Sequence, residues 1–289
     1  MYPSDSWTDR MGEKSPKRAL VIEGGGFRAL YAAGAIYQLL KEAPHLHFDV
    51  VVANSASVGT GAYFVTKQIQ EIESIWLGNI LTSPKLLSFW RVPISWWKSL
   101  VDLDFLFDDV FKKQFPLDLG LLKKSPTDFY VTVMHYESGR RCAFSNRDPE
   151  IFEAMKASCA VPWAYNRKIY IQGERYLDGF YDSIPLRIAK EKDCKEIWVI
   201  STREHGYRKG RLKLFEKIPQ KSCQLLAKRH FYYNETAKEI EQNQNYRVVR
   251  PKERLPVARF NNDIKGLHHI FALGREDMKE HLGLILNKA

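Results

Sequence analysis

Three consecutive glycines, Gly24, Gly25 and Gly26, stand between two segments of different character. The apolar run 19–22 before them is typical of a buried strand, and 29–40 after them has the apolar spacing of a helix. Glycines at such a corner leave backbone N–H groups bare and let a ligand approach closely, and the helix adds a positive dipole end. The corner is therefore predicted to bind negative charge, either a phosphate or an oxyanion that forms only in a transition state.

A serine lies at a second corner of the same kind. The segment 48–57 is predicted to be a strand that runs into a turn, and 58–70 is predicted to be a helix. A serine between strand and helix is the layout of a nucleophile elbow, which is usually spelled G-x-S-x-G. Here Ala53 and Ser57 replace the glycines around Ser55. Both are small, so the turn is predicted to be tighter than usual and still possible.

An acid and a glycine, Asp178 and Gly179, occur together further along, before a proline turn. The glycine corner, the serine elbow and this pair, in this order, resemble the motifs of the patatin-like phospholipases. The segment 157–163 is similar to the part of that family that leads to the aspartate, and the resemblance runs from about Lys17 nearly to the end. The chain departs from the family at Phe180, where a small residue is usual.

The resemblance implies a Ser–Asp dyad in which Ser55 is the nucleophile and Asp178 is its base, with Arg28 supporting the loop or the substrate. It also implies that backbone N–H groups hold the oxyanion, at Gly24, Gly25, Gly26 and Ala56. The implied activity is that of a serine acyl-ester hydrolase, a lipid acyl hydrolase of the phospholipase A or lysophospholipase type, without cofactor or metal. His135 and His230 belong to no motif and are left out of the site.

The order strand, glycine corner, helix, strand, elbow, helix implies an α/β fold. We expect a three-layer sandwich with a mainly parallel central sheet covered by helices, as in patatins. Later apolar runs predict further strands at 129–134, 196–200 and 246–249, and helices at 224–242 and 263–286. The predicted organisation is a polar tail over 1–16 and a single patatin-like hydrolase domain over 17–289. Its helical extension, from about residue 216, is expected to be integral to it.

Charge and composition limit the classes of binding partner that we expect. The chain has 289 residues and a formal net charge of +10, which attracts nucleic acid or anionic lipid. No nucleic-acid motif occurs, so we expect a lipid or ester substrate and peripheral contact with a membrane; a basic protein without a charged partner is the alternative. No apolar run reaches the roughly 18 residues of a membrane span, and the polar N-terminus lacks a signal-peptide core. A cytoplasmic protein is therefore expected, and the four cysteines, which match no zinc pattern, are expected to be free thiols.

An aromatic-rich stretch, 86–115, separates the elbow helix from the next predicted strand. Tryptophan combines an apolar body with a polar N–H and suits membrane interfaces, so Trp90, Trp96 and Trp97 allow a lid that faces acyl chains or the membrane. The other interpretation is a helical cap whose aromatic side chains belong to the core. Aspartates in the same stretch oppose contact with anionic lipid.

Other functions and roles stay open. The spacing Gly24-x-Gly26-x-x-Ala29 also fits dinucleotide binding, although the acid expected at the end of the second strand is missing. The altered elbow favours a second alternative, in which the protein has lost hydrolase activity and only binds lipid or a partner. Arg28 has an alternative role in an ion pair with an acid under the loop. Asp182, the other acid near the glycine motif, is expected to cap or solvate the turn.

Overall fold

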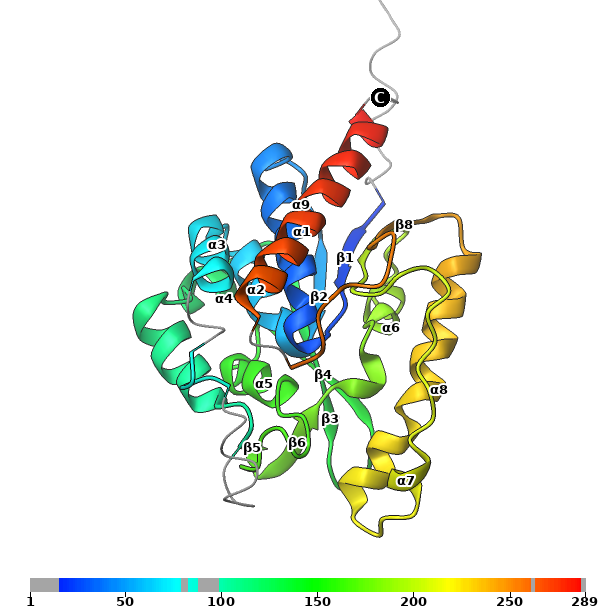
Figure 1. The fold of residues 1–289 in the computed structure, drawn as a ribbon. Helices are drawn as coiled ribbons and strands as arrows, with labels where there is room; N and C mark the ends of the chain where they lie inside the picture. The colour runs from blue at the N-terminus through cyan, green and yellow to red at the C-terminus, as the bar shows by residue number, and fades with distance from the viewer. Residues whose placement is uncertain (1–15, 79–82, 88–98, 261–262, 287–289) are drawn as a thin grey trace, which may run out of the picture.

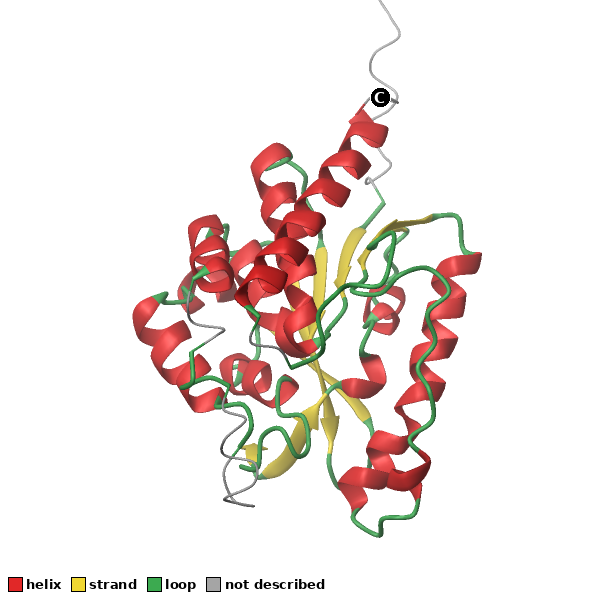
Figure 2. Cartoon of the chain, viewed as in Figure 1, coloured by secondary structure: helices red, strands yellow, loops and turns green. Residues whose placement is uncertain are grey.

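The computed structural model describes residues 16–78, 83–87, 99–260 and 263–286, and within them one mixed sheet is covered by helices on both faces (Figures 1 and 2). The strands are β1 (Arg18–Ile22), β2 (Val50–Asn54), β3 (Asp128–His135), β4 (Arg141–Ser145), β5 (Ile169–Ile171), β6 (Glu174–Asp178), β7 (Glu196–Ile200) and β8 (Tyr246–Val249). Their order in the sheet is β5-β6-β3-β2-β1-β7-β8, and β4 pairs with β3.

The helices follow the corners and connections between the strands. They are α1 (Ala29–Glu42), α2 (Val58–Val65), α3 (Ile69–Leu77), α4 (Leu119–Lys124), α5 (Ile151–Ser158), α6 (Leu186–Glu191), α7 (Lys213–Glu216), α8 (Lys221–Gln242) and α9 (Ile264–Leu286). Short 3₁₀ turns precede three of them, η1 (Gly26–Arg28), η2 (Ser55–Ser57) and η5 (Phe180–Asp182), and a π-helical segment, η4, spans Phe105–Gln114.

The predicted α/β sandwich is confirmed. The strands β3, β2, β1, β7 and β8 are parallel neighbours, and the strands predicted at 19–22, 196–200 and 246–249 match β1, β7 and β8. The antiparallel strands β4, β5 and β6 at one edge were not among the predicted strands. The sheet is therefore mixed, with a parallel centre.

Alternate residues of β1 face opposite layers. Leu20 and Ile22 lie in the core shared with α1, α2, α3 and α9, whereas Ala19 and Val21 lie in the core shared with α6 and α8. Figure 1 shows α8 on the opposite side of the sheet from α1 and α9. Because all four side chains are fully buried, β1 is a central strand covered on both faces, as a parallel sheet requires.

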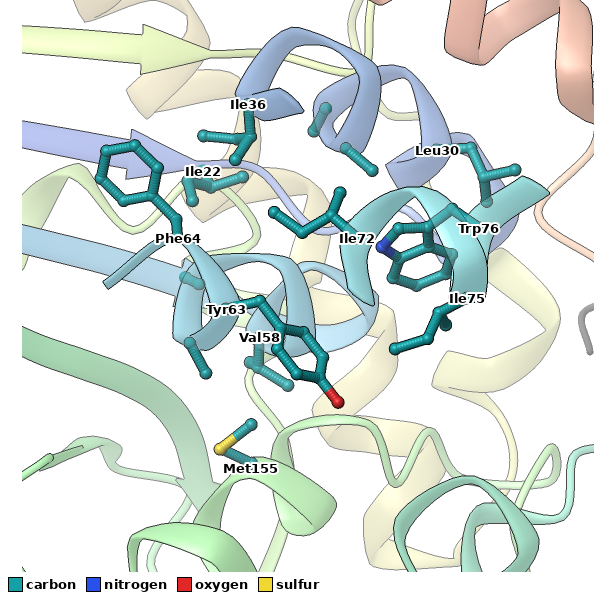
Figure 3. Close-up of a cluster of buried hydrophobic side chains, with 14 of the residues drawn as sticks. Ile22, Leu30, Ile36, Val58, Tyr63, Phe64, Ile72, Ile75, Trp76 and Met155 are labelled. Carbon is teal, nitrogen blue, oxygen red and sulfur yellow. The ribbon is translucent and has the colours of Figure 1, made fainter. Parts of the chain in front are cut away.

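Helices α1, α2 and α3 share one apolar cluster on the first face (Figure 3). Trp76, Ile72 and Ile75 project from α3 toward Leu30 of α1 and Tyr63 of α2. Full burial of each such side chain contributes about 1.5–3 kcal/mol, so this cluster fixes the helices that follow the two corners.

The single helix predicted over 58–70 is wrong. The structure has two helices, α2 and α3, separated at Lys67, whose φ of 60° lies in the left-handed region. The backbone N–H of Gln68 turns back to the carbonyl of Tyr63 at 2.9 Å. No glycine or proline marks this break, which is why the helical spacing of the sequence conceals it.

The C-terminal helix α9 packs directly on α1. A side chain at Gly34 of α1 would collide with the carbonyl of Phe271, and one at Gly274 of α9 would collide with the carbonyl of Tyr31. The two backbones therefore touch where each helix has a glycine. This contact joins the end of the chain to the helix that begins at the glycine corner (Figure 1).

The described part of the aromatic stretch belongs to the core. Phe107 and Phe111 of η4 are buried, and Phe111 stacks edge-on against Tyr63 of α2 at a centroid distance of 5.7 Å. Trp90, Trp96 and Trp97 lie outside the described residues. Phe107 and Phe111 are thus core residues, and Phe111 also lines the apolar pocket described below.

Candidate active site

The ends of two strands meet on β3 and bring together the residues of the predicted dyad. Strand β2 runs parallel to β3 and pairs Asn54 with Thr132, while β6 runs antiparallel and pairs Asp178 with Val133. Strand β4 occupies the other side of β3, so β2 and β6 share one side and point their carboxyl ends at each other. Ser55, the residue after β2, therefore faces Asp178.

The side chains of Ser55 and Asp178 are hydrogen-bonded. The Ser55 hydroxyl donates to Asp178 Oδ2 at 2.6 Å, and the two residues are only 9% and 2% exposed. Burial raises the pKa of Asp178 to about 6, against the opposing effects of the Ser55 hydrogen bond and of the Arg259 and Lys209 charges. The carboxylate is thus mainly ionised at neutral pH, while its basicity exceeds that of an exposed aspartate.

Ser55 is held in a strained backbone conformation. Its φ of 53° lies in the left-handed region, which costs a non-glycine residue on the order of 1 kcal/mol or more. Its N–H donates to Ser158 Oγ at 2.8 Å, and the Ser158 hydroxyl in turn donates to the Thr132 carbonyl at 2.8 Å. Ser158 lies in the family-like segment 157–163, but nothing in the sequence marks it as the residue that fixes the nucleophile.

The glycine corner lies directly against the elbow. A Cβ at Gly24 would lie 2.7 Å from the carbonyl oxygen of Asn54, so only glycine lets the loop approach the serine turn. The N–H of Gly24 donates to the Ser183 carbonyl at 2.9 Å and is engaged. The N–H groups of Gly25 and Gly26 have no acceptor among the described residues. Of the predicted oxyanion donors in the corner, these two are therefore free to act.

Gly26 and its neighbour are held by the segment before α9. Gly26 has φ of 60°, and a side chain there would collide with the Arg259 carbonyl. The same carbonyl accepts the N–H of Phe27 at 2.9 Å. Ala56, the fourth predicted donor, follows Ser55 in η2, and its N–H also lacks an acceptor within the described part of the chain.

The Asp-Gly pair needs its glycine for close packing. A side chain at Gly179 would collide with Asn54 Oδ1 and with the carbonyl of Thr132. Asn54 Oδ1 in turn accepts the Thr132 hydroxyl at 3.0 Å, so this packed group sets the position of Asp178. The unusual third residue, Phe180, is buried and lines the pocket beside the dyad.

Both substitutions in the elbow have a structural counterpart. An ideal Cβ on Gly61 of α2 would lie 3.0 Å from the Cβ of Ala53, so the missing side chain of Gly61 leaves room for the Ala53 methyl. The Ser57 hydroxyl donates to the Glu23 carbonyl at 2.7 Å and ties the elbow to the start of the glycine corner. Each of the two substituted side chains therefore has a place in the elbow.

One pocket contains the dyad and is predominantly apolar. The space in this pocket, counted together with the open solvent at its mouth, is about 910 Å³. Ser55, Asp178 and the three glycines line one end. The rest of the wall is made mainly by apolar side chains, which include Trp76, Leu86, Val101, Leu103, Leu106, Phe111, Val161 and Phe260. Such a wall suits a hydrocarbon chain whose ester group lies at the polar end.

Arg28 does not form the ion pair that was its alternative role. Its side chain is 6% exposed, and no carboxylate among the described residues pairs with it. Burial, together with the charges of Arg203 and Arg259, lowers the pKa of Arg28 to about 10, while Glu23 opposes the change.

Asp182, which was expected to cap or solvate the turn, is not exposed to solvent. It is buried and pairs with Arg141 at 3.0 Å.

The histidines left out of the site have partners of their own. His230 Nδ1 is hydrogen-bonded to the Ala227 carbonyl at 2.8 Å, and His135 Nε2 lies 2.9 Å from Glu174.

The four cysteines are free thiols, as expected. One of them, Cys159, lies in the pocket wall, where its thiol donates to the Ser55 carbonyl at 3.2 Å.

Neither a cluster of metal ligands nor a membrane-spanning helix occurs in the described ranges. Across 16–78, 83–87, 99–260 and 263–286, no three His, Cys, Asp or Glu side chains gather as metal ligands would. Across the same ranges, no helix combines the length and the apolar character that crossing a membrane requires.

Comparison with known proteins identifies the family. A family model described as patatin-like phospholipase matches residues 20–190, which is more than half of the chain. The chain belongs to the patatin-like phospholipase family. The matched region contains the glycine corner, Ser55 and Asp178 of this patatin-like protein. A second model, a domain of unknown function called DUF6363, matches residues 220–287.

Two individual proteins are similar to this patatin-like chain. The uncharacterized protein YjjU of Escherichia coli K12 is 26% identical over 190 residues, which cover 64% of this chain and 51% of YjjU. The chain thus spans about half the length of this curated relative. The crystal structure of VipD from Legionella pneumophila has a TM-score of 0.53 at 12% identity, over 93% of this chain and 67% of VipD. At this identity the likeness concerns the fold.

Proposed function

We propose that the protein is a serine acyl-ester hydrolase of the lipid acyl hydrolase type, in which Ser55 is the nucleophile and Asp178 is the general base. The observation that carries the proposal is the 2.6 Å hydrogen bond between the two side chains at the polar end of an apolar pocket. Family membership supports a lipid ester as the substrate class. The apolar wall supports an acyl chain as the part of the substrate that the pocket holds.

The reaction would proceed in two steps. Asp178 accepts the hydroxyl proton while Ser55 Oγ attacks the ester carbonyl, and the N–H groups of Gly25, Gly26 and Ala56 stabilise the oxyanion. Asp178 returns the proton to the leaving alcohol, which gives an acyl-enzyme. A water molecule then loses a proton to Asp178 and attacks the acyl carbon. Collapse of this intermediate releases the fatty acid, and Asp178 returns the proton to Ser55 Oγ.

The two rival functions lose their specific support. The altered elbow favoured a hydrolase without activity, but the space beside Gly61 and the Ser57 hydrogen bond accommodate both substitutions. Dinucleotide binding rested on the glycine spacing, and the same glycines here adjoin a serine paired with an aspartate. Both observations favour the hydrolase.

We also propose that the region from about residue 216 is an integral part of the hydrolase. The helix α9 packs on α1 through the glycine contact, and the Arg259 carbonyl holds the glycine corner. Residues 17–289 would then act as one patatin-like unit.

The proposed function is tested by covalent labelling and by the pH profile. A fluorophosphonate probe is expected to modify Ser55, as identified by peptide mass spectrometry. The kcat/KM for a soluble ester should rise about tenfold per pH unit below about pH 6 and level off above it, because only ionised Asp178 accepts the proton and its pKa is about 6. Labelling at another residue, or a profile that is flat between about pH 5 and pH 8, contradicts the assignment.

Peripheral membrane contact has a candidate surface, which consists of Trp163, Leu214 and Phe215. Trp163 is 48% exposed and stacks on Phe215 at 5.0 Å, and Leu214 of α7 is 70% exposed. Val161 and Ala164, in the same turn as Trp163, line the pocket. We propose that this surface meets the lipid interface at the pocket.

Replacing Trp163 and Leu214 together with serine is expected to lower hydrolysis of ester in anionic vesicles by about tenfold or more, because each exposed apolar side chain contributes transfer energy at the interface. Turnover of a soluble ester should change little. The matched control is Leu121→Ser on α4, an exposed leucine outside this surface. An equal loss of hydrolysis with vesicles and with the soluble ester would contradict the proposal, because it would show that the substitutions act through the stability of the protein.

A further inference from the structure

Five cationic side chains gather behind the glycine corner. They come from η1, from the segment after β7, from α8 and from the segment before α9, and are Arg28, Arg203, Lys209, Arg229 and Arg259. The charges of Arg203 and Arg259 act on Arg28, and those of Arg259, Arg229 and Arg28 act on Lys209. Within the described residues none of the five forms an ion pair, whereas the neighbouring Arg208 pairs with Glu241 at 2.6 Å.

The carboxylate of Asp178 interacts with the charges of Arg259 and Lys209. The carboxylate of Glu23 acts on Arg28 and Lys209. Its Oε2 already accepts the Ser201 hydroxyl at 2.6 Å and the Thr202 N–H at 2.7 Å. Two carboxylates, those of Glu23 and Asp178, thus act on this group of four arginines and one lysine, and that of Glu23 is already engaged by neutral donors.

This arrangement leaves buried positive charge only partly compensated. Arg28 is 6% exposed and Lys209 is 8% exposed. The Nε atoms of Arg28 and Arg229 are buried without an acceptor among the described residues. Burial and the neighbouring cations hold the pKa of Lys209 well below its usual range. Buried cations that form no ion pair are costly, so a ligand that supplies negative charge would stabilise this group.

The pocket leads to these cations. Arg259 lines it next to Gly26, and Ser183 lines it and accepts a hydrogen bond from Lys209 Nζ at 2.7 Å. Arg203, Arg229 and Arg259 are half-buried, so these three residues are accessible in part from solvent. An anion beside the dyad would meet Arg259 first.

We infer that Arg28, Arg203, Lys209, Arg229 and Arg259 form a binding site for a phosphate-type anion, next to the glycine corner and continuous with the acyl-ester pocket. Guanidinium groups are suited to phosphate because they donate paired hydrogen bonds. Arg229 and Arg259 lie in the 220–287 region of unknown function, so this region supplies part of the site. The anion is either the headgroup of the substrate, in which case the inference rests on the proposed hydrolase, or free phosphate.

The first experiment measures binding without turnover. Inorganic phosphate at millimolar concentration is expected to raise the melting temperature of the wild type relative to chloride at equal ionic strength. Arg229→Gln should remove most of this rise. The matched control is Lys228→Gln, the exposed neighbour on α8, which should keep it. A wild type that melts alike in phosphate and chloride overturns the site, whatever the protein hydrolyses.

The second experiment distinguishes the two sources of the anion. A short-chain monoacylglycerol and its 3-phosphate carry the same ester with and without the anion. A headgroup site predicts that the wild type prefers the phosphorylated ester at least about tenfold in kcat/KM, and that Arg229→Gln but not Lys228→Gln reduces this ratio. A phosphate-dependent rise in melting temperature with a ratio near one supports a site for free phosphate. Absence of turnover on both esters would contradict the proposed function and leave the binding result decisive for the site.

Discussion

Replacing Asp178 by asparagine is expected to abolish ester hydrolysis and to raise the melting temperature of the protein. Asparagine can still accept the Ser55 hydrogen bond, but it cannot take the proton, so turnover should fall by about 10³-fold or more. Asp178 is completely buried, and a rise in its pKa from 3.8 to about 6 corresponds to about 3 kcal/mol against the ionised form in the folded state. Asparagine carries no charge to bury.

The sign of the stability effect depends on pH. Below about pH 4 the carboxyl is neutral in both the folded and the unfolded state, so the wild type and Asp178→Asn should melt alike. Between about pH 4 and pH 6 the unfolded state ionises more readily, and the wild type loses stability relative to the variant. At about pH 8 the variant should melt about 5 °C higher, as measured by calorimetry.

Ser55→Ala is the control for this pair of effects. It should be equally inactive, but it keeps the buried carboxylate and removes the hydroxyl that favours the ionised form, so no gain in stability is expected. A folded Asp178→Asn protein that retains turnover within about tenfold of the wild type would exclude Asp178 as the base.

Replacing Gly61 by alanine is expected to damage the active site from outside the pocket. The new methyl would lie 3.0 Å from the Cβ of Ala53 and 2.9 Å from Cε2 of Phe129. Overpacking of this kind costs about 1–3 kcal/mol. The collision also pushes α2 away from the end of β2, and a shift of about 1 Å at Ser55 can cost about 10² in rate.

The pairing of Ala53 with Gly61 can be tested by a double-mutant cycle. Gly61→Ala should cost less in the Ala53→Gly background, with a coupling of about 0.5 kcal/mol or more in the free energy of unfolding and a partial return of kcat. The rescue is partial because the contact with Phe129 remains. Gly283→Ala is the matched control, since a Cβ at this α9 glycine meets nothing within 4 Å. Additive costs would show that Gly61 does not accommodate the Ala53 methyl.

The buried parallel strands could be predicted because their signal is local. Both β1 and β7 are continuous apolar runs, and each is flanked by turn or helix patterns. Strands β4, β5 and β6 escaped prediction because they are partly exposed, so their sequences are not continuous apolar runs. Their pairing with β3 is nevertheless what sets Asp178 opposite Ser55.

The residues of the candidate site also fall into those that could be predicted from the sequence and those that could not. Ser55, Asp178 and the glycines could be predicted because their motifs are short and ordered along the chain. The contacts of Ser158 and Arg259 with the site could not, because each joins segments far apart in the sequence and uses a residue type that is common elsewhere. The role of the Ser57 hydroxyl could not be predicted either: it bonds to the carbonyl of Glu23 in a distant segment, and its loss would leave that buried acceptor unpaired.

The bond between the Phe27 N–H and the Arg259 carbonyl has a consequence for biosynthesis. A ribosome delivers residue 27 long before residue 259, and both corners that carry the glycines and Ser55 emerge early. Until the segment before α9 has left the ribosome, the glycine corner lacks the carbonyl that holds Phe27. The nascent chain therefore carries its nucleophile without a completed oxyanion site until residue 259 has emerged, and the proposed activity begins only after that point.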